Sequence, residues 1–202
     1  WNYGFGGAVA VPEIAGWLTT DADSTLASNT YSFWALGTDT ASSARSPVFA
    51  HGDPLAPSGE QGGFFFNFAS GRPLLNFDAS CFVYYTDSPA QDDSAWHYWT
   101  VYMDIVDITK SEVYVDNVLL PIDVYDVYDC PPTPWTGGLA LFSADGYYFD
   151  GALDDFAALS GNISSSHRTD IYNDGAGKRW DESEYYNISN TLYYNDLDSI
   201  TP

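Results

Sequence analysis

The sequence predicts an all-β fold, an antiparallel jelly-roll sandwich of two sheets, from three observations. Clusters of Gly, Pro, Ser, Asn and Asp interrupt the chain about every ten residues, which is the turn spacing of β-sandwiches. The runs between these breaks are rich in aromatic side chains, 17% of the whole chain, and in β-branched ones, which favour strands. Strong helix formers are scarce, with six Lys and Arg and one Met among 202 residues.

These runs mark the expected strands. In chain order they are residues 7–11, 30–36, 47–51, 63–68, 74–77, 82–85, 97–105, 112–119, 139–142 and 153–159. Asp116-Asn117 reads as a hairpin turn inside the eighth run. One short helix is expected at residues 164–172, because serines can cap its start and Asn173-Asp174-Gly175 can end it.

Two loops and a tail complete the chain. The loops span residues 52–63, rich in Gly and Pro, and residues 123–138, with three Asp and a Pro-rich end. After Lys178, two Tyr pairs stand among Asn, Asp and Ser. We therefore divide the chain into a sandwich over residues 1–179 and an extended tail over residues 180–202. The tail either packs back on its own sandwich or adds to a neighbouring molecule.

Charge excludes two classes of partner. Six Lys and Arg against 28 Asp and Glu give a net charge of −22, which phosphate backbones and anionic membrane surfaces repel. We therefore expect no nucleic-acid binding. No apolar run reaches the about 20 residues that span a bilayer, so we expect no membrane insertion. The chain begins at Trp1 without a targeting segment, and we expect a processed chain or a fragment of a longer protein.

Three stretches, in this order, resemble the laminin-G-like branch of the concanavalin A-like jelly rolls. They are TYSFWA at 30–35, AWHYWTVY at 95–102 followed by EVYVDNV at 112–118, and FDGALDDFAALS at 149–160. SHRTDIYNDG at 166–175 then stands where the family carries a short helix. Asn117 replaces the usual turn glycine, which is tolerated because Asn also accepts positive φ. The resemblance covers residues 5–177.

The resemblance implies no catalytic residues. Laminarinase-like glycosidases on this fold use a Glu-x-Asp-x-x-Glu strand, because glycoside cleavage needs paired carboxylates. None of the five Glu residues opens that pattern; they are Glu13, Glu60, Glu112, Glu182 and Glu184. His51, His97 and His167 accompany no nucleophile motif, and we expect His97 to pack or cap a strand.

A calcium site and a carbohydrate site are the candidate binding sites. Relatives with structural Ca²⁺ use an acid of the closing strand, which implies Asp155, with Glu13 as an early-chain partner; the alternative is solvated charge at a strand edge. Sugars are bound by flat rings beside hydrogen-bonding groups. The candidates are Trp135, Tyr147, Tyr148, Trp96 and the 52–63 loop, with core packing as the alternative for each ring.

Two glycosylation patterns point outside the cell, where disulfides form. Cys81 and Cys130 are either buried thiols or one disulfide, and we expect the disulfide. Asn162 and Asn187 each open an Asn-Ile-Ser acceptor pattern for N-glycosylation. We therefore expect an extracellular location, at a cell or virion surface.

The expected function is a non-catalytic module for structure or adhesion, for example a self-assembling subunit of a filament or other surface structure. Its partners would be a glycan, a protein, or further copies joined through the tail. The alternative is a carbohydrate-binding, lectin-like module. A glycan-active enzyme is a third reading.

Overall fold

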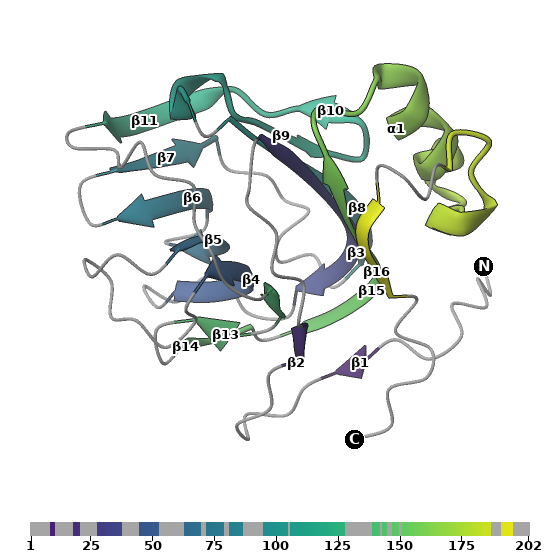
Figure 1. Cartoon of the computed structure of the whole chain (residues 1–202), viewed down its shortest axis with the longest axis horizontal. Helices are drawn as coiled ribbons and strands as arrows, with labels where there is room; N and C mark the ends of the chain where they lie inside the picture. Colours follow the sequence, from purple (N-terminus) through teal and green to yellow (C-terminus); the bar gives the residue numbers. More distant parts are fainter. Residues whose placement is uncertain are drawn as a thin grey trace.

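The computed structural model confirms the all-β class, with two antiparallel sheets and one short α-helix in the part of the chain that it describes (Figure 1). It describes residues 9–10, 18–20, 28–37, 45–52, 63–69, 72–78, 81–86, 95–104, 106–127, 139–141, 143–144, 147–149, 151–186 and 191–195.

Sheet A is built around the long strand β15. Its strand order is β1, β15, β3, β8, β9, β10, and β16 also pairs with β15. The bounds are β1 Val9–Ala10, β3 Asn29–Gly37, β8 Trp96–Met103, β9 Glu112–Val115, β10 Val118–Leu119, β15 Gly151–Ser160 and β16 Thr191–Asn195. One edge of β15 pairs with β3. The opposite edge of β15 pairs with β1 at residues 152–153 and with β16 at residues 156–159.

Sheet B faces sheet A and has the strand order β11, β7, β6, β5, β4, β12, β2. The bounds are β2 Leu18–Thr20, β4 Arg45–Gly52, β5 Gly63–Ala69, β6 Arg72–Asp78, β7 Cys81–Tyr85, β11 Ile122–Val127 and β12 Leu139–Leu141. A separate two-stranded ribbon joins β13, Ser143–Ala144, to β14, Tyr147–Tyr148.

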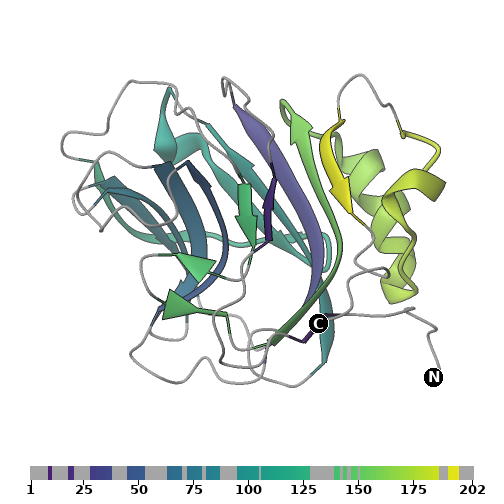
Figure 2. The ribbon, with the colours of Figure 1, turned by 60° about the horizontal axis from the view of Figure 1, so that its bottom comes forward.

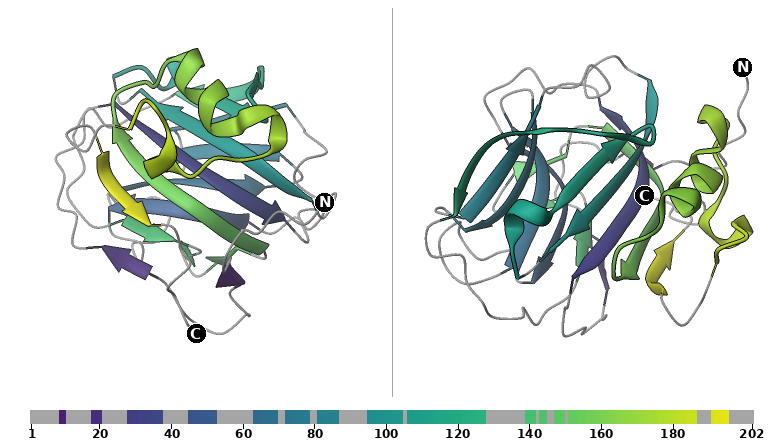
Figure 3. Two further views of the ribbon diagram at one scale, coloured as in Figure 1. Left: turned by 90° about the vertical axis from the view of Figure 1, so that its right-hand side faces the viewer. Right: turned by 90° about the horizontal axis from the view of Figure 1, so that it is seen from above.

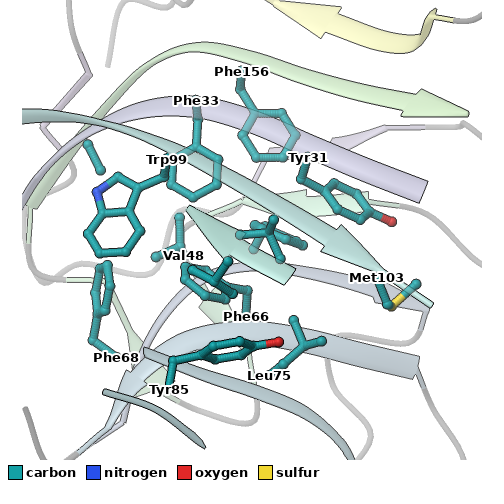
Figure 4. Packing of buried hydrophobic residues seen from close by; sticks show 14 of the residues in the cluster. Tyr31, Phe33, Val48, Phe66, Phe68, Leu75, Tyr85, Trp99, Met103 and Phe156 are labelled. Carbon is teal, nitrogen blue, oxygen red and sulfur yellow. The ribbon is translucent and has the colours of Figure 1, made fainter. Parts of the chain in front are cut away.

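The main core lies between the two sheets and is mostly aromatic (Figure 4). Phe33 of β3 stacks on Phe156 of β15 with ring centroids 5.7 Å apart, and Phe49 of β4 packs between them and Phe66. Rings bury large apolar areas and gain a further 0.5–1.5 kcal/mol or so from offset or edge contacts. Nine described aromatic residues are buried in this core.

The helix α1, Ser165–Tyr172, covers the outer face of sheet A and makes a third layer (Figures 2 and 3). Ser164 caps its start by accepting a hydrogen bond from the His167 amide (3.2 Å), and Asn173 ends it in the left-handed conformation, both as the sequence predicts. Seven buried residues from both layers form a second core: Trp34, Tyr98, Ala157, Leu159, Ile163, Ile171 and Trp180.

The described part of the tail packs on its own sandwich. Trp180 is only 2% exposed, and its amide donates to Asp155 Oδ2 (2.9 Å). Asp170 of α1 accepts from the Ser183 hydroxyl (2.7 Å), and β16 pairs with β15. The sequence leaves two alternatives for the tail, packing on its own sandwich or pairing with a neighbouring molecule. Residues 180–186 and 191–195 pack on their own sandwich. The domain boundary between 179 and 180 stays a prediction.

One expected loop is wrong in part, because residues 122–127 form strand β11 at the edge of sheet B. Asp is depleted in strands, and Asp123 and Asp126 therefore favour a loop in sequence reasoning. An edge strand tolerates charged side chains, which oppose pairing with other molecules, and the Asp123 side chain is 44% exposed. The remainder of the expected loop 123–138 lies outside the described residues.

The disulfide stays a prediction. Cys81 begins β7 and is buried in the main core, at 1% exposure, while Cys130 lies outside the described residues. We expect intact mass after alkylation under non-reducing conditions to show no free thiol. Two alkylated cysteines would contradict the pairing.

No helix in the described residues is long and apolar enough to cross a bilayer.

Candidate functional site

Polar and aromatic side chains gather on the outer side of sheet A, where three segments distant in sequence meet. Trp96 starts β8, Asp116 and Asn117 form the turn between β9 and β10, and Tyr172 and Asp174 lie at the end of α1. We call these five residues the rim site.

The turn has the geometry that its sequence predicts. Asp116 and Asn117 both have positive φ, 50° and 64°, which is the two-residue hairpin turn that Asn and Asp accept. Asn117 Nδ2 donates to Thr169 Oγ1 of α1 over 2.8 Å. This hydrogen bond joins the turn to α1. It therefore brings Asp116 and Asn117 near the helix end that carries Tyr172 and Asp174.

Two hydrogen bonds hold the Asp116 carboxylate in place. Its Oδ2 accepts a 2.6 Å hydrogen bond from His97 Nδ1, and its Oδ1 accepts one from the Tyr98 amide (3.1 Å). The His97 side chain is 15% exposed and that of Asp116 is 29% exposed. His97 thus holds a partly exposed carboxylate in place, and the expectation that it caps a strand is refined to this role.

Trp96 and Tyr172 are the aromatic part of the rim site, which we call the aromatic wall. Tyr172 is stacked near both Trp34 and Tyr98, with ring centroids 6.4 Å apart in each pair. Trp34 and Tyr98 are themselves 5.4 Å apart and buried. Tyr172 and Trp96 pack against this second core and stay half-buried, so buried rings hold two rings at the surface.

Two carboxylates of the rim site affect the pKa of the Tyr172 hydroxyl. Burial raises the pKa of the Tyr172 hydroxyl, and the carboxylates of Asp116 and Asp174 raise it further. The hydroxyl therefore stays protonated and available as a donor at neutral pH.

This arrangement combines two kinds of binding group. Half-exposed rings offer flat apolar faces, while Asp116, Asn117 and Tyr172 offer acceptors and donors at fixed positions. Flat, hydroxyl-rich molecules use both kinds of group, because sugar rings carry apolar C–H faces and polar edges.

A second polar surface lies on the outer face of sheet B. The Arg72 guanidinium lies 4.7 Å from the centre of the Tyr84 ring and forms an ion pair with Asp123. Phe82 packs edge-on against Tyr84 at 5.5 Å. Because Arg72 covers the Tyr84 ring and is itself neutralised, a ligand would have to displace it, and the rim site is the better candidate.

The calcium expectation stays a prediction. Asp155 is 6% exposed and sits in a bulge of β15 with φ 50°, where its Oδ2 accepts from the Trp180 amide. Glu13 lies outside the described residues. Within the described ranges, no three His, Cys, Asp or Glu side chains gather as a metal site.

Several predicted residues cannot be placed. Trp135 and Asn187 lie outside the described residues, and the structure describes Tyr147 and Tyr148 by backbone alone, in β14. Asn162 is exposed in the turn before α1 and donates to Glu112 Oε2 (3.3 Å). Its glycosylation stays a prediction.

Sequence reasoning included Trp96 among the carbohydrate candidates but missed Asp116, Asn117, Tyr172 and Asp174 as site residues. The first two were identifiable only as a turn and the last two only as a helix end. The hydrogen bond that joins the turn to α1, from Asn117 to Thr169, spans 52 residues of sequence, and no local pattern predicts it.

No family model and no curated protein matches this chain. Three solved structures are similar, each with a TM-score of 0.53. One is the sialidase of Trypanosoma rangeli, at 12% identity over 75% of this chain and 24% of the enzyme. Another is the binding domain of botulinum neurotoxin DC, solved with rat synaptotagmin II, at 10% identity over 73% of this chain and 35% of that one.

The third similar structure is botulinum neurotoxin type C, whose cell entry depends on interaction with two ganglioside molecules. It is 11% identical over 75% of this chain and 36% of the toxin chain. This chain therefore spans between a quarter and about a third of these proteins. At such identity the matches show a shared β-sandwich, which occurs as part of an enzyme and as part of toxin binding domains.

Proposed function

We propose that this protein is a non-catalytic, extracellular carbohydrate-binding module of the laminin-G-like type. The observation that carries the proposal is the rim site, where Trp96 and Tyr172 pack half-buried on the second core and the Asp116 carboxylate is hydrogen-bonded to the Tyr98 amide of that core. Rings and hydrogen-bonding groups on one surface are the combination that sugar recognition needs.

The comparisons favour this lectin-like reading over a self-assembling structural subunit. A neurotoxin that shares the fold interacts with gangliosides, and another was solved with a protein partner. In contrast, the described part of the tail, on which the assembly reading depends, contacts its own sandwich. A glycan ligand is therefore the first partner to test.

We expect Trp96→Ala to weaken glycan binding about five- to tenfold, because an aromatic contact contributes about 1 kcal/mol. A glycan array first identifies the ligand of the unchanged protein. Isothermal titration with that ligand then compares the variant, whose fold is checked by near-ultraviolet circular dichroism.

Tyr125→Ala is the matched control, because Tyr125 is a 57% exposed ring on β11 of sheet B, away from the rim site. Its affinity should equal that of the unchanged protein. Equal losses in both variants, or no loss with Trp96→Ala, would contradict the assignment of the rim site. An array on which nothing binds would contradict the function.

A further inference from the structure

We infer that the rim site takes neutral or basic glycans and excludes sialylated and sulfated ones. This inference rests on the proposed function and names the ligand class of that same site. It also departs from what the sialidase and ganglioside-interacting relatives suggest.

The structure describes five of the six Lys and Arg side chains, all but that of Arg45, and each of the five is engaged elsewhere. Four of them pair with carboxylates: Arg72 with Asp123, Lys110 with Asp107, Lys178 with Asp170, and Arg179 with Asp181. The fifth, Arg168, lies 3.7 Å over the Tyr114 ring and donates to the Ile163 carbonyl (2.9 Å). Among the described side chains, each Lys and Arg thus has a partner, and binding an anionic sugar would require breaking one of these contacts.

The rim site itself carries two carboxylates, those of Asp116 and Asp174. Asp116 is 29% exposed in its side chain, and Asp174 is exposed at the end of α1. Both act on the Tyr172 hydroxyl, which lies in the aromatic wall. A sugar stacked on that wall would bring any carboxylate or sulfate of its own close to these two.

The charge of the whole chain acts in the same direction. A net charge of −22 repels anions over distances of about a Debye length, roughly 10 Å at 0.1 M salt. Like charges brought together at an interface suppress binding of the wrong partner. An ammonium group on the sugar would be attracted by the same two carboxylates.

The test uses three oligosaccharides with one shared core: the neutral form, a form with a free amine, and a sialylated form. We expect the neutral and amine forms to bind, and the sialylated form to bind at least about tenfold more weakly at low salt. Added salt should narrow the difference, because it screens repulsion.

Two variants locate the discrimination. Asp116→Asn and Asp174→Asn each remove one charge, and Asn accepts the positive φ of residue 116. Each variant should lower the ratio of the affinity for the neutral form to that for the sialylated form by about threefold. Glu182→Gln is the matched control, since it removes one exposed charge from the tail and should leave the ratio unchanged.

The outcomes separate the two proposals. Equal or tighter binding of the sialylated form would overturn this inference and leave the carbohydrate-binding function standing. A ratio that changes equally in Glu182→Gln would overturn the assignment to the rim site carboxylates. Failure of all three oligosaccharides, together with an empty array, would overturn the proposed function itself.

Discussion

Replacing Trp180 by Ala should lower the free energy of unfolding by about 3–5 kcal/mol, the range for removing a large buried ring. Trp180 is 2% exposed and packs in the second core between α1 and sheet A. Its ring stacks on His167 at 4.4 Å, and its Nε1 donates to Thr191 Oγ1 of β16 (3.3 Å). Loss of this side chain therefore leaves a cavity and removes a contact to the last strand. Urea unfolding followed by far-ultraviolet circular dichroism measures the change.

Tyr186→Ala is the control for this prediction. Tyr186 is 38% exposed and touches the Trp180 ring edge-on at 6.4 Å, so its loss should cost less than about 1 kcal/mol. If Trp180→Ala also costs less than that, the tail does not pack on the sandwich as the structure has it. The assembly reading would then regain its main support.

This packing also changes how assembly can be tested. Removal of residues after 179 would delete Trp180 from the second core and β16 from the edge of β15. A truncated chain could therefore aggregate because it unfolds, which scattering alone would not distinguish from lost assembly. Point variants such as Tyr186→Ala are the sharper tools, since they leave the core intact.

Sequence patterns predicted the frame of the fold well where one face of a strand is buried. Phe33 and Trp99 lie in runs whose aromatic and β-branched content predicts strands, and both enter the main core. The ends of α1 were predictable too, since Ser164 and Asn173 are residues that cap helices locally. These features depend on near neighbours in sequence.

Features that depend on distant contacts were not predictable. Asp155 reads as a metal ligand or as surface charge, yet it is buried and accepts a hydrogen bond from Trp180, 25 residues away. The sequence identifies Asp116 as a turn residue, and only the fold joins its turn to α1, through the hydrogen bond from Asn117 to Thr169. The role of a carboxylate depends on whether it contacts water, an amide or a ligand. Tertiary structure determines these contacts, so the sequence alone does not reveal the role.

Acid should destabilise the second core through His167. This residue is 8% exposed, between Trp180 and the Tyr185 ring at 5.1 Å. Burial lowers the pKa of His167 from 6.5 to about 4, with Arg168 also lowering it and Asp170 partly opposing the shift. The folded state thus favours the neutral ring, whereas the unfolded chain takes up a proton below pH 6.5 or so. Stability is complete above that pH and falls as the pH approaches 4.

We expect the protein to lose about 1–3 kcal/mol between pH 7 and 4.5 from this group. His167→Phe keeps a ring against Trp180 and cannot be protonated. Between pH 7 and 4.5, the unfolding free energy of this variant should therefore fall by about 1–3 kcal/mol less than that of the unchanged protein. The comparison between the two proteins cancels the titration of carboxylates, such as Asp170, whose pKa is lowered by the Ser183 hydroxyl and Lys178. Urea unfolding at half-unit pH steps gives both curves. Parallel curves would show that His167 is not buried against Trp180 in solution, and would remove the tail contact that the structure describes.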